Sequence, residues 1–172
     1  DQSTLRFNDK TIQTSYFDFF TDTETAKFKD GFVILTNNNQ TKTNQATFDV
    51  NNSKIMAINN VITTYNQDVK SSDSPQIQSL TQFPTRITSS KMSINFQNES
   101  SPNITYLGNV MIQQSDKLLN SDMVHLNFEK NHYFASSNVK FSVDNLLWSI
   151  GNQKISNLEI KQMLNSKTTI QS

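Results

Sequence analysis

The sequence predicts an all-β fold, a sandwich, roll or barrel of short strands. Two observations predict it. Apolar and polar residues alternate with a period of two in several segments, and clusters of Asn separate these segments at short intervals. A period of two gives a strand one apolar and one polar face, and many short strands with regular turns are typical of all-β domains. Gly is scarce, at 3 of 172 residues, so the turns are expected to use Asn and Asp, which tolerate the left-handed conformation.

Four segments carry the clearest alternation, and each predicts a strand with one buried face. In the first, Thr47 and Asp49 form the polar face opposite the apolar one. The predicted apolar faces are Ala46, Phe48 and Val50; Met92, Ile94 and Phe96; Val124, Leu126 and Phe128; and Val139, Phe141 and Val143. The candidate turns are Asn37 to Asn39, Asn51 to Ser53, Asn59-Asn60, Asn98 to Asn103 and Asn145.

The length of 172 residues supports one domain, residues 1–172, with two halves. Residues 68–89 lack periodicity and hold Pro75 and Pro84. They predict an irregular connection between an N-terminal half, about 5–67, and a C-terminal half, about 90–165.

The C-terminal segment is ambiguous. Ser156 to Leu164 fits a strand and a short helix equally, because Ser156 and Glu159 have the spacing of a capping box while the apolar residues fit a helix imperfectly. Residues 166–172 are expected to fray.

Composition excludes several classes of protein. Lys and Arg number 15 and Asp and Glu 15, so the chain lacks the excess of positive charge that a nucleic-acid binder uses. It has no Cys, hence no disulfide, thiolate nucleophile or Cys-ligated zinc. No apolar run approaches the roughly 20 residues that span a bilayer. The opening residues, Asp1 to Thr4, show no signal peptide, which predicts a mature or trimmed chain.

A short motif recurs along the chain. The motif is a Val that follows two residues, at least one of which is Gly, Ser or Asn. It occurs at Val33, Val61, Val110 and Val139, with gaps of 28, 49 and 29 residues. Each copy follows an alternating segment, and Gly151 to Ile155 resembles a degenerate fifth copy. A unit of this kind cannot bury its apolar face alone, so stacked copies are expected to share one interior.

Three runs carry a resemblance to a known family. They are Ser90 to Phe96, Tyr106 to Gln114 with its Leu-Gly-Asn-Val core, and Leu119 to Val124. Their order resembles the OstA-like repeat of lipopolysaccharide transport proteins. The resemblance covers residues 88–143 best and residues 12–66 more weakly. The chain departs from the pattern at Asn59 and Ser137, where the family has Gly before Asn-Val, and at Ser121-Asp122, where the family has Ala-Asp.

The resemblance implies a β-jellyroll folded like an open V from twisted antiparallel sheets, with an apolar groove that holds lipid acyl chains. It implies a non-enzymatic, periplasmic protein of the LptA type that bridges inner- and outer-membrane components, or an LptC-type component of the inner-membrane complex. It also implies partners joined through edge strands, about Leu5 to Phe19 and Lys154 to Leu164, with a head-to-tail homo-oligomer as one outcome. No cofactor is expected. The candidate groove residues are Phe48, Val50, Val61, Met92, Ile94, Phe96, Val110, Ile112, Val124, Leu126, Phe128, Val139 and Phe141.

A second hypothesis belongs to a different class. A surface adhesin or carbohydrate-binding sandwich would place Asn, Ser and Thr against sugar hydroxyls, on loops around a closed core. Lys54, Arg86, Lys91 and Lys117 are available for lipid phosphates in the first hypothesis, but sequence alone does not place them at a groove mouth.

Catalytic and metal sites find little support. His125 and His132 have no obvious carboxylate as a third metal ligand. The acidic residues near the start of the chain, Asp18 to Asp30, are expected to form a solvated turn rather than a pair of catalytic carboxylates.

Overall fold

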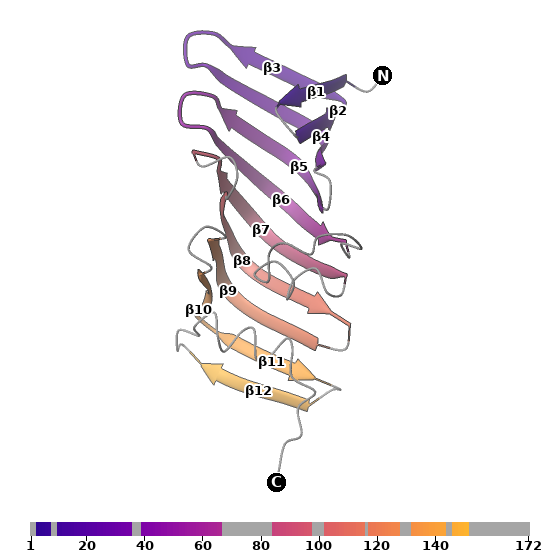
Figure 1. The fold of residues 1–172 in the computed structure, drawn as a ribbon, viewed down its shortest axis with the longest axis vertical. Helices are drawn as coiled ribbons and strands as arrows, with labels where there is room; N and C mark the ends of the chain where they lie inside the picture. Colours follow the sequence, from indigo (N-terminus) through magenta and orange to yellow (C-terminus); the bar gives the residue numbers. More distant parts are fainter. Residues whose placement is uncertain are drawn as a thin grey trace, which may run out of the picture.

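In the described residues of the computed structural model, twelve strands form one antiparallel sheet (Figure 1), which confirms the predicted all-β class. Strands that follow one another along the chain mostly lie side by side, in the order β1-β2-β4-β5-β6-β7-β8-β9-β11-β12, while β3 pairs with β4 and β10 with β9. The strands are β1 (Ser3–Phe7), β2 (Lys10–Thr14), β3 (Tyr16–Phe20), β4 (Thr25–Leu35), β5 (Asn39–Asp49), β6 (Lys54–Tyr65), β7 (Thr85–Asn95), β8 (Asn103–Gln114), β9 (Lys117–Asn127), β10 (His132–Ser136), β11 (Val139–Val143) and β12 (Leu146–Gly151). The structure describes residues 3–7, 10–35, 39–66, 84–97, 102–115, 117–127, 132–143 and 146–151.

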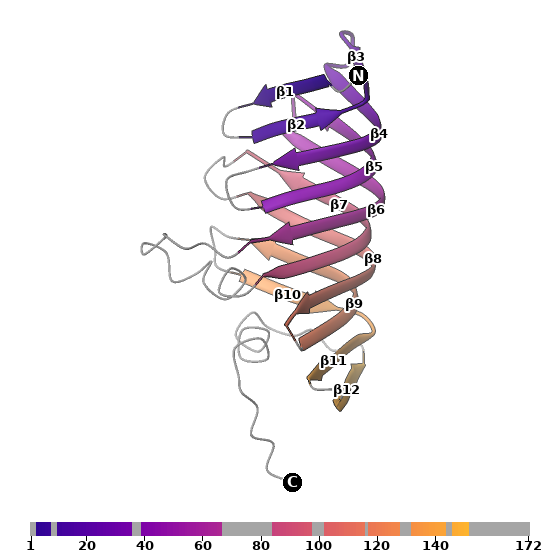
Figure 2. The same ribbon diagram turned by 90° about the vertical axis from the view of Figure 1, so that its right-hand side faces the viewer.

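The six central strands, β4 to β9, are long and bent. Each has 11 or 12 residues, and the register between neighbours shifts near the middle, for example between Ile58 and Val61 of β6. The bends lie along one side of the molecule, so that the sheet folds into two facing halves (Figure 2). We call them arm A and arm B. Arm A comprises β3, β10 and residues 25–29, 45–49, 54–58, 91–95, 103–107 and 123–127; arm B comprises β1, β2, β11, β12 and residues 32–35, 39–42, 61–65, 85–88, 110–114 and 117–121.

On alternate strands of the sheet, residues in the left-handed conformation form the bend. Asn and Gly adopt this conformation at the lowest cost, and a strand that must turn a corner needs it. The left-handed pairs are Asn59-Asn60 in β6, Gly108-Asn109 in β8 and Ser137-Asn138 between β10 and β11.

Hydroxyl groups complete the bend on the intervening strands. The single hydroxyl hydrogen of Thr43 is shared between the carbonyl of Ile58, at 2.8 Å, and that of Gln45, at 3.2 Å. Ser89 donates to the carbonyl of Lys91 at 2.9 Å. Thr14 and Ser121 donate in the same way to carbonyls two residues further on, at 2.8 and 3.0 Å. These bonds satisfy carbonyls that the interrupted strand ladder leaves open.

The recurring motif therefore marks the bend. Val61 and Val110 directly follow left-handed pairs and face Ser89 and Ser121 across the sheet. In β4 the equivalent residue is Phe32, which faces Thr43, so the predicted alignment at Val33 was wrong by one residue. With Phe32 in place, the repeat spacing is 29 residues in both halves, from 32 to 61 and from 110 to 139.

The structure corrects two further predictions. Asn59-Asn60 is not a turn between strands but the bend within β6, because β6 continues to Tyr65. Residues 85–89, predicted to belong to the irregular connection, lie in β7, which begins at Thr85, and residues 67–83 lie outside the described residues. The predicted strand or helix at Ser156 to Leu164 and the frayed tail at 166–172 lie outside the described residues. Among the described residues, none forms a helix with the length and hydropathy required to cross a bilayer.

Candidate binding interior between the two arms

The inner face of arm A is apolar from β3 to β9. Residues opposite one another on neighbouring strands share a face of the sheet, so the register defines rows of inward side chains. The row farthest from the bend is Phe19, Ala26, Phe48, Ile55, Ile94, Ile104 and Leu126; the next is Phe17, Phe28, Ala46, Ala57, Met92, Tyr106, Val124 and Ala135.

The inner face of arm B is apolar in its centre, with threonines in between. Its middle row is Ile12, Ile34, Thr41, Thr63, Ile87, Ile112, Leu119 and Phe141. Thr41 and Thr63 bond to each other through their hydroxyls at 2.9 Å, so that these two buried polar groups are satisfied.

Polar side chains of the described residues make contacts that join the arms. The hydroxyl of Tyr65 in arm B lies 3.3 Å from that of Tyr106 in arm A. The Thr63 hydroxyl lies 3.8 Å from Sδ of Met92. Nζ of Lys10, at the start of β2, lies 4.9 Å from the centroid of the Phe96 ring, directly after β7, which is a cation–π geometry. Burial raises the pKa of Tyr106, whose hydroxyl is thereby held neutral.

The interior is closed in this structure. Ala57, Val61, Ile87, Tyr106 and Leu119 are each 0% exposed, although they come from both arms. Inner residues of both arms are thus shielded from solvent, and a ligand between the arms would have to displace the contacts that join them.

The residues predicted to line a groove lie here, with two exceptions. Val50 is 39% exposed, because β5 ends at Asp49 and the turn that follows is held by a 3.0 Å bond from the Asn52 amide to the Asp49 carboxylate. Phe128 lies outside the described residues. The remaining predicted residues are buried: Phe48, Val61, Met92, Ile94, Phe96, Val110, Ile112, Val124, Leu126, Val139 and Phe141. Their contact with a lipid stays a prediction.

Sequence reasoning missed other large members of this interior. Phe28, Ile87 and Tyr106 are as buried as the predicted set. The alternation of Thr85, Ile87 and Ser89 was the available signal, but two of its three inward residues are polar, so it does not read as an apolar face.

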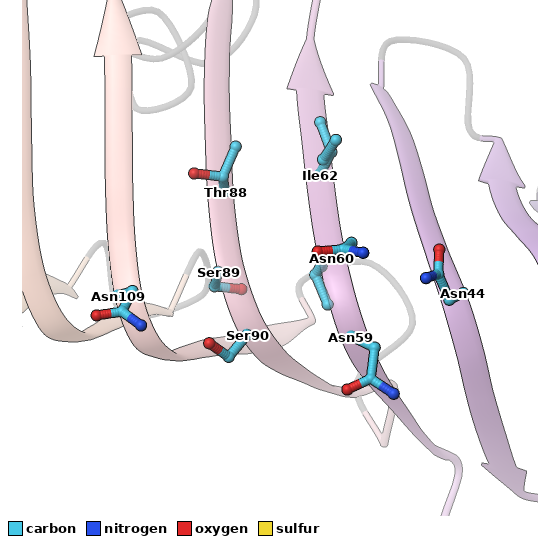
Figure 3. A pocket seen from close by; sticks show the side chains of 9 residues that line it. Asn44, Asn59, Asn60, Ile62, Thr88, Ser89, Ser90 and Asn109 are labelled. Carbon is cyan, nitrogen blue, oxygen red and sulfur yellow. The ribbon is translucent and has the colours of Figure 1, made fainter.

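A second concave feature lies along the bend, away from the interior (Figure 3). It is a pocket of about 700 Å³, and most of its lining side chains are exposed amides and hydroxyls, without a charged group. Several of these residues hold the left-handed backbone of the bend. The lining is Asn44, Asn59, Asn60, Val61, Ile62, Thr88, Ser89, Ser90 and Asn109.

The structure describes the surroundings of His125, one of the two histidines considered as metal ligands. Nδ1 of His125 lies 2.9 Å from the Thr105 hydroxyl, and its ring lies 5.2 Å from that of Phe134. In the part of the chain that the structure describes, no three His, Asp or Glu side chains gather as a metal site would require.

Comparison with known proteins identifies the family. Residues 86–172 match the family model described as "LptA/(LptD N-terminal domain) LPS transport protein", which covers half of the chain. The chain belongs to this family. This confirms the resemblance on which the transport hypothesis rests and favours that hypothesis over a carbohydrate-binding sandwich.

A solved structure supports the fold of this family member. The chain is similar to LptH from Pseudomonas aeruginosa, described as the LptA-homologous periplasmic component of the conserved lipopolysaccharide transport device. The TM-score is 0.58 at 9% sequence identity, over 86% of this chain and 92% of LptH. At this identity the likeness shows the jellyroll fold alone. A comparison with curated protein sequences finds no match.

Proposed function

We propose that this lipopolysaccharide transport protein carries its cargo by holding the acyl chains between arms A and B. The observation that supports this most directly is the apolar inner face of arm A, where the outermost row is apolar on every strand from β3 to β9. No bond is made or broken in such a mechanism. The protein acts as a non-enzymatic carrier in the periplasm.

The free energies involved allow acyl chains to enter between the arms. Burying a CH₂ group is worth roughly 0.8 kcal/mol, so a chain with about ten of them gains at most about 8 kcal/mol. The two polar cross-arm contacts, Tyr65 with Tyr106 and Lys10 with Phe96, are each worth about 1 kcal/mol. When an acyl chain enters, the inner apolar side chains replace contacts with one another by contacts with the chain. Acyl chains therefore can displace the contacts that close the interior, and passage between two similar interiors changes the free energy little. Direction must come from an external motor.

Edge strands would connect the carrier to other components. In the described part of the chain, β1 and β3 pair on one side only, so arm B and arm A each present an unpaired edge at the N-terminal end. Tyr16, Phe17, Phe19 and Phe20 of β3 are 43 to 51% exposed. Unpaired edges are templates for strand addition. We propose that another OstA-like transport protein, or a second copy in head-to-tail order, pairs here to bridge inner- and outer-membrane components.

Site-specific photo-crosslinking tests the carrier mechanism. A benzophenone side chain replaces Phe48, which is 5% exposed on the inner face, or Met56, which is 48% exposed on the neighbouring strand. We expect a crosslink to lipopolysaccharide from position 48, removed by unlabelled lipopolysaccharide and not by a neutral polysaccharide, and none from position 56. Equal crosslinking at both positions, or none at 48 in a folded protein, would reject an interior site.

A further inference from the structure

The pocket along the bend lies away from the interior between the arms and is built by four neighbouring strands, β5 to β8 (Figure 3). Three strand-to-strand steps separate the first of these strands from the last, which is about 14 Å across the sheet. The volume of about 700 Å³ lies within the usual range for pockets that bind organic ligands. The pocket therefore has the size of a ligand site rather than of an ion site.

The bend itself holds several amide side chains of the pocket in place. Asn59, Asn60 and Asn109 have left-handed backbone, with φ of 65°, 56° and 50°, and this conformation accounts for Asn at these positions. Asn44 lies beside them on β5, is exposed, and does not have a positive φ. Its amide is therefore not explained by the geometry of the backbone.

The amide groups of the pocket are available to a ligand. Within the part of the chain that the structure describes, the side chains of Asn44, Asn60 and Asn109 make no hydrogen bond to protein, and that of Asn59 makes a long one of 3.4 Å to Gln45. Each Asn amide offers two donors and a carbonyl acceptor. Hydroxyl groups, which also donate and accept, would satisfy both kinds of group.

Charge and apolar surface narrow the class of ligand. The lining contains no charged side chain, while Ile62, which is half-buried, adds an apolar surface between the amides. Lys42, which faces Ile62 across the sheet, and Lys91, which follows Ser90, are not part of the lining. A phosphate or carboxylate would thus find no partner of opposite charge in the pocket. A sugar ring has hydroxyl groups at its edge and C–H groups on its faces, and so matches amides around an apolar side chain.

We propose that the bend pocket binds a neutral saccharide chain, with the amides of Asn44, Asn60 and Asn109 as hydrogen-bonding groups and Ile62 against a sugar ring. This inference goes beyond the proposed carrier function and does not depend on it, because the site lies outside the space between the arms. The chain can be a neutral stretch of the sugar part of lipopolysaccharide or a separate glycan.

Nuclear magnetic resonance of the side-chain amides in the full chain tests the site directly. We expect maltohexaose, chitohexaose or the dephosphorylated saccharide released from lipopolysaccharide to shift the signals of Asn44, Asn60 and Asn109 at about millimolar concentration. These ligands carry no acyl chain, so their binding is distinct from that of a lipid between the arms. Binding of any of them supports the proposal, and the tightest identifies the source of the saccharide. Hexagalacturonate, a chain of charged sugars, should leave the same signals unchanged.

Variants assign the binding to the pocket. Asn60→Gly with Asn109→Gly removes two amides and keeps the left-handed backbone, and should weaken saccharide binding about tenfold. Asn138→Gly is the matched control, because Asn138 is also left-handed, with φ of 53°, and lies at the bend outside this pocket.

Three outcomes would overturn the proposal: no shift with any neutral saccharide, an equal or larger shift with hexagalacturonate, or equal affinity in the wild type and the double variant. Crosslinking of lipopolysaccharide from position 48 is measured separately, so failure of the pocket leaves the carrier mechanism in place.

Discussion

The hydroxyl of Tyr65 in arm B lies 3.3 Å from the hydroxyl of Tyr106 in arm A, and this bond joins two halves of one sheet across its interior. Tyr65 is the last residue of β6 and is 5% exposed, whereas Tyr106 is the largest fully buried side chain of arm A. The pair therefore reports directly on whether the arms are together, and it offers the simplest way to measure how strongly they are held.

A double-mutant cycle on this pair should show coupling. Tyr65→Phe and Tyr106→Phe each remove one hydroxyl and leave the other buried, so each should lower the free energy of unfolding by about 1 kcal/mol. The double variant should lose less than the sum, by about 0.5–1 kcal/mol, because the second substitution removes a hydroxyl that has already lost this bond. Urea denaturation measures all four proteins. Tyr16→Phe serves as the control, since that hydroxyl bonds to Asp18 on the surface; strictly additive losses at 65 and 106 would mean that the bond does not hold the arms.

Alkaline pH should weaken the fold through Tyr106. Burial raises its pKa in the folded state above the ordinary value of 10.0, so the fold favours the neutral hydroxyl. The sign follows from linkage: this contribution is fully present below about pH 10 and is lost as pH rises through the folded pKa. The unfolding free energy of the wild type should therefore fall from pH 8 to pH 11 more than that of Tyr106→Phe. Parallel pH profiles of the two proteins would show that Tyr106 does not control this loss.

Substitutions of the left-handed residues in the bend should differ strongly in their effect on stability. Gly108 has φ of 75°, and an added Cβ would lie 3.1 Å from Cβ and Oγ of Ser90. Gly108→Ala should therefore cost about 1–2 kcal/mol of stability. Asn60, with φ of 56°, lies at the equivalent bend of β6, so Asn60→Gly should be close to neutral and Asn60→Val should destabilise. Thermal unfolding of the three variants is the measurement, and equal melting temperatures for Asn60→Gly and Asn60→Val would contradict a left-handed requirement.

Alternation and the Asn-containing repeat were enough to predict the strands and most of the buried residues. Val61, Val110 and Val139 were found because each combines an apolar residue with the Asn that the bend requires. The same Asn residues led to a wrong prediction of a turn at Asn59-Asn60, since a left-handed pair within a strand and one in a turn have the same composition. The rows of inward residues could not be found from sequence. Ile12 and Phe141 are 129 positions apart, and only the cross-strand register brings them into one row.

Enlarging the interior should increase the stabilisation that a bound hydrocarbon chain gives to the protein. Ile87 is 0% exposed in the middle row of arm B, so Ile87→Ala should destabilise the free protein by about 2–5 kcal/mol and leave a cavity. A hydrocarbon chain that fills this cavity restores part of the lost contact. Saturating dodecyl phosphate should therefore raise the melting temperature of Ile87→Ala by more than that of the wild type. Ile62→Ala is the control, because Ile62 lies on the outward side of β6 beside the bend pocket and should respond to ligand like the wild type. An equal thermal shift in all three proteins would place the chain outside this interior.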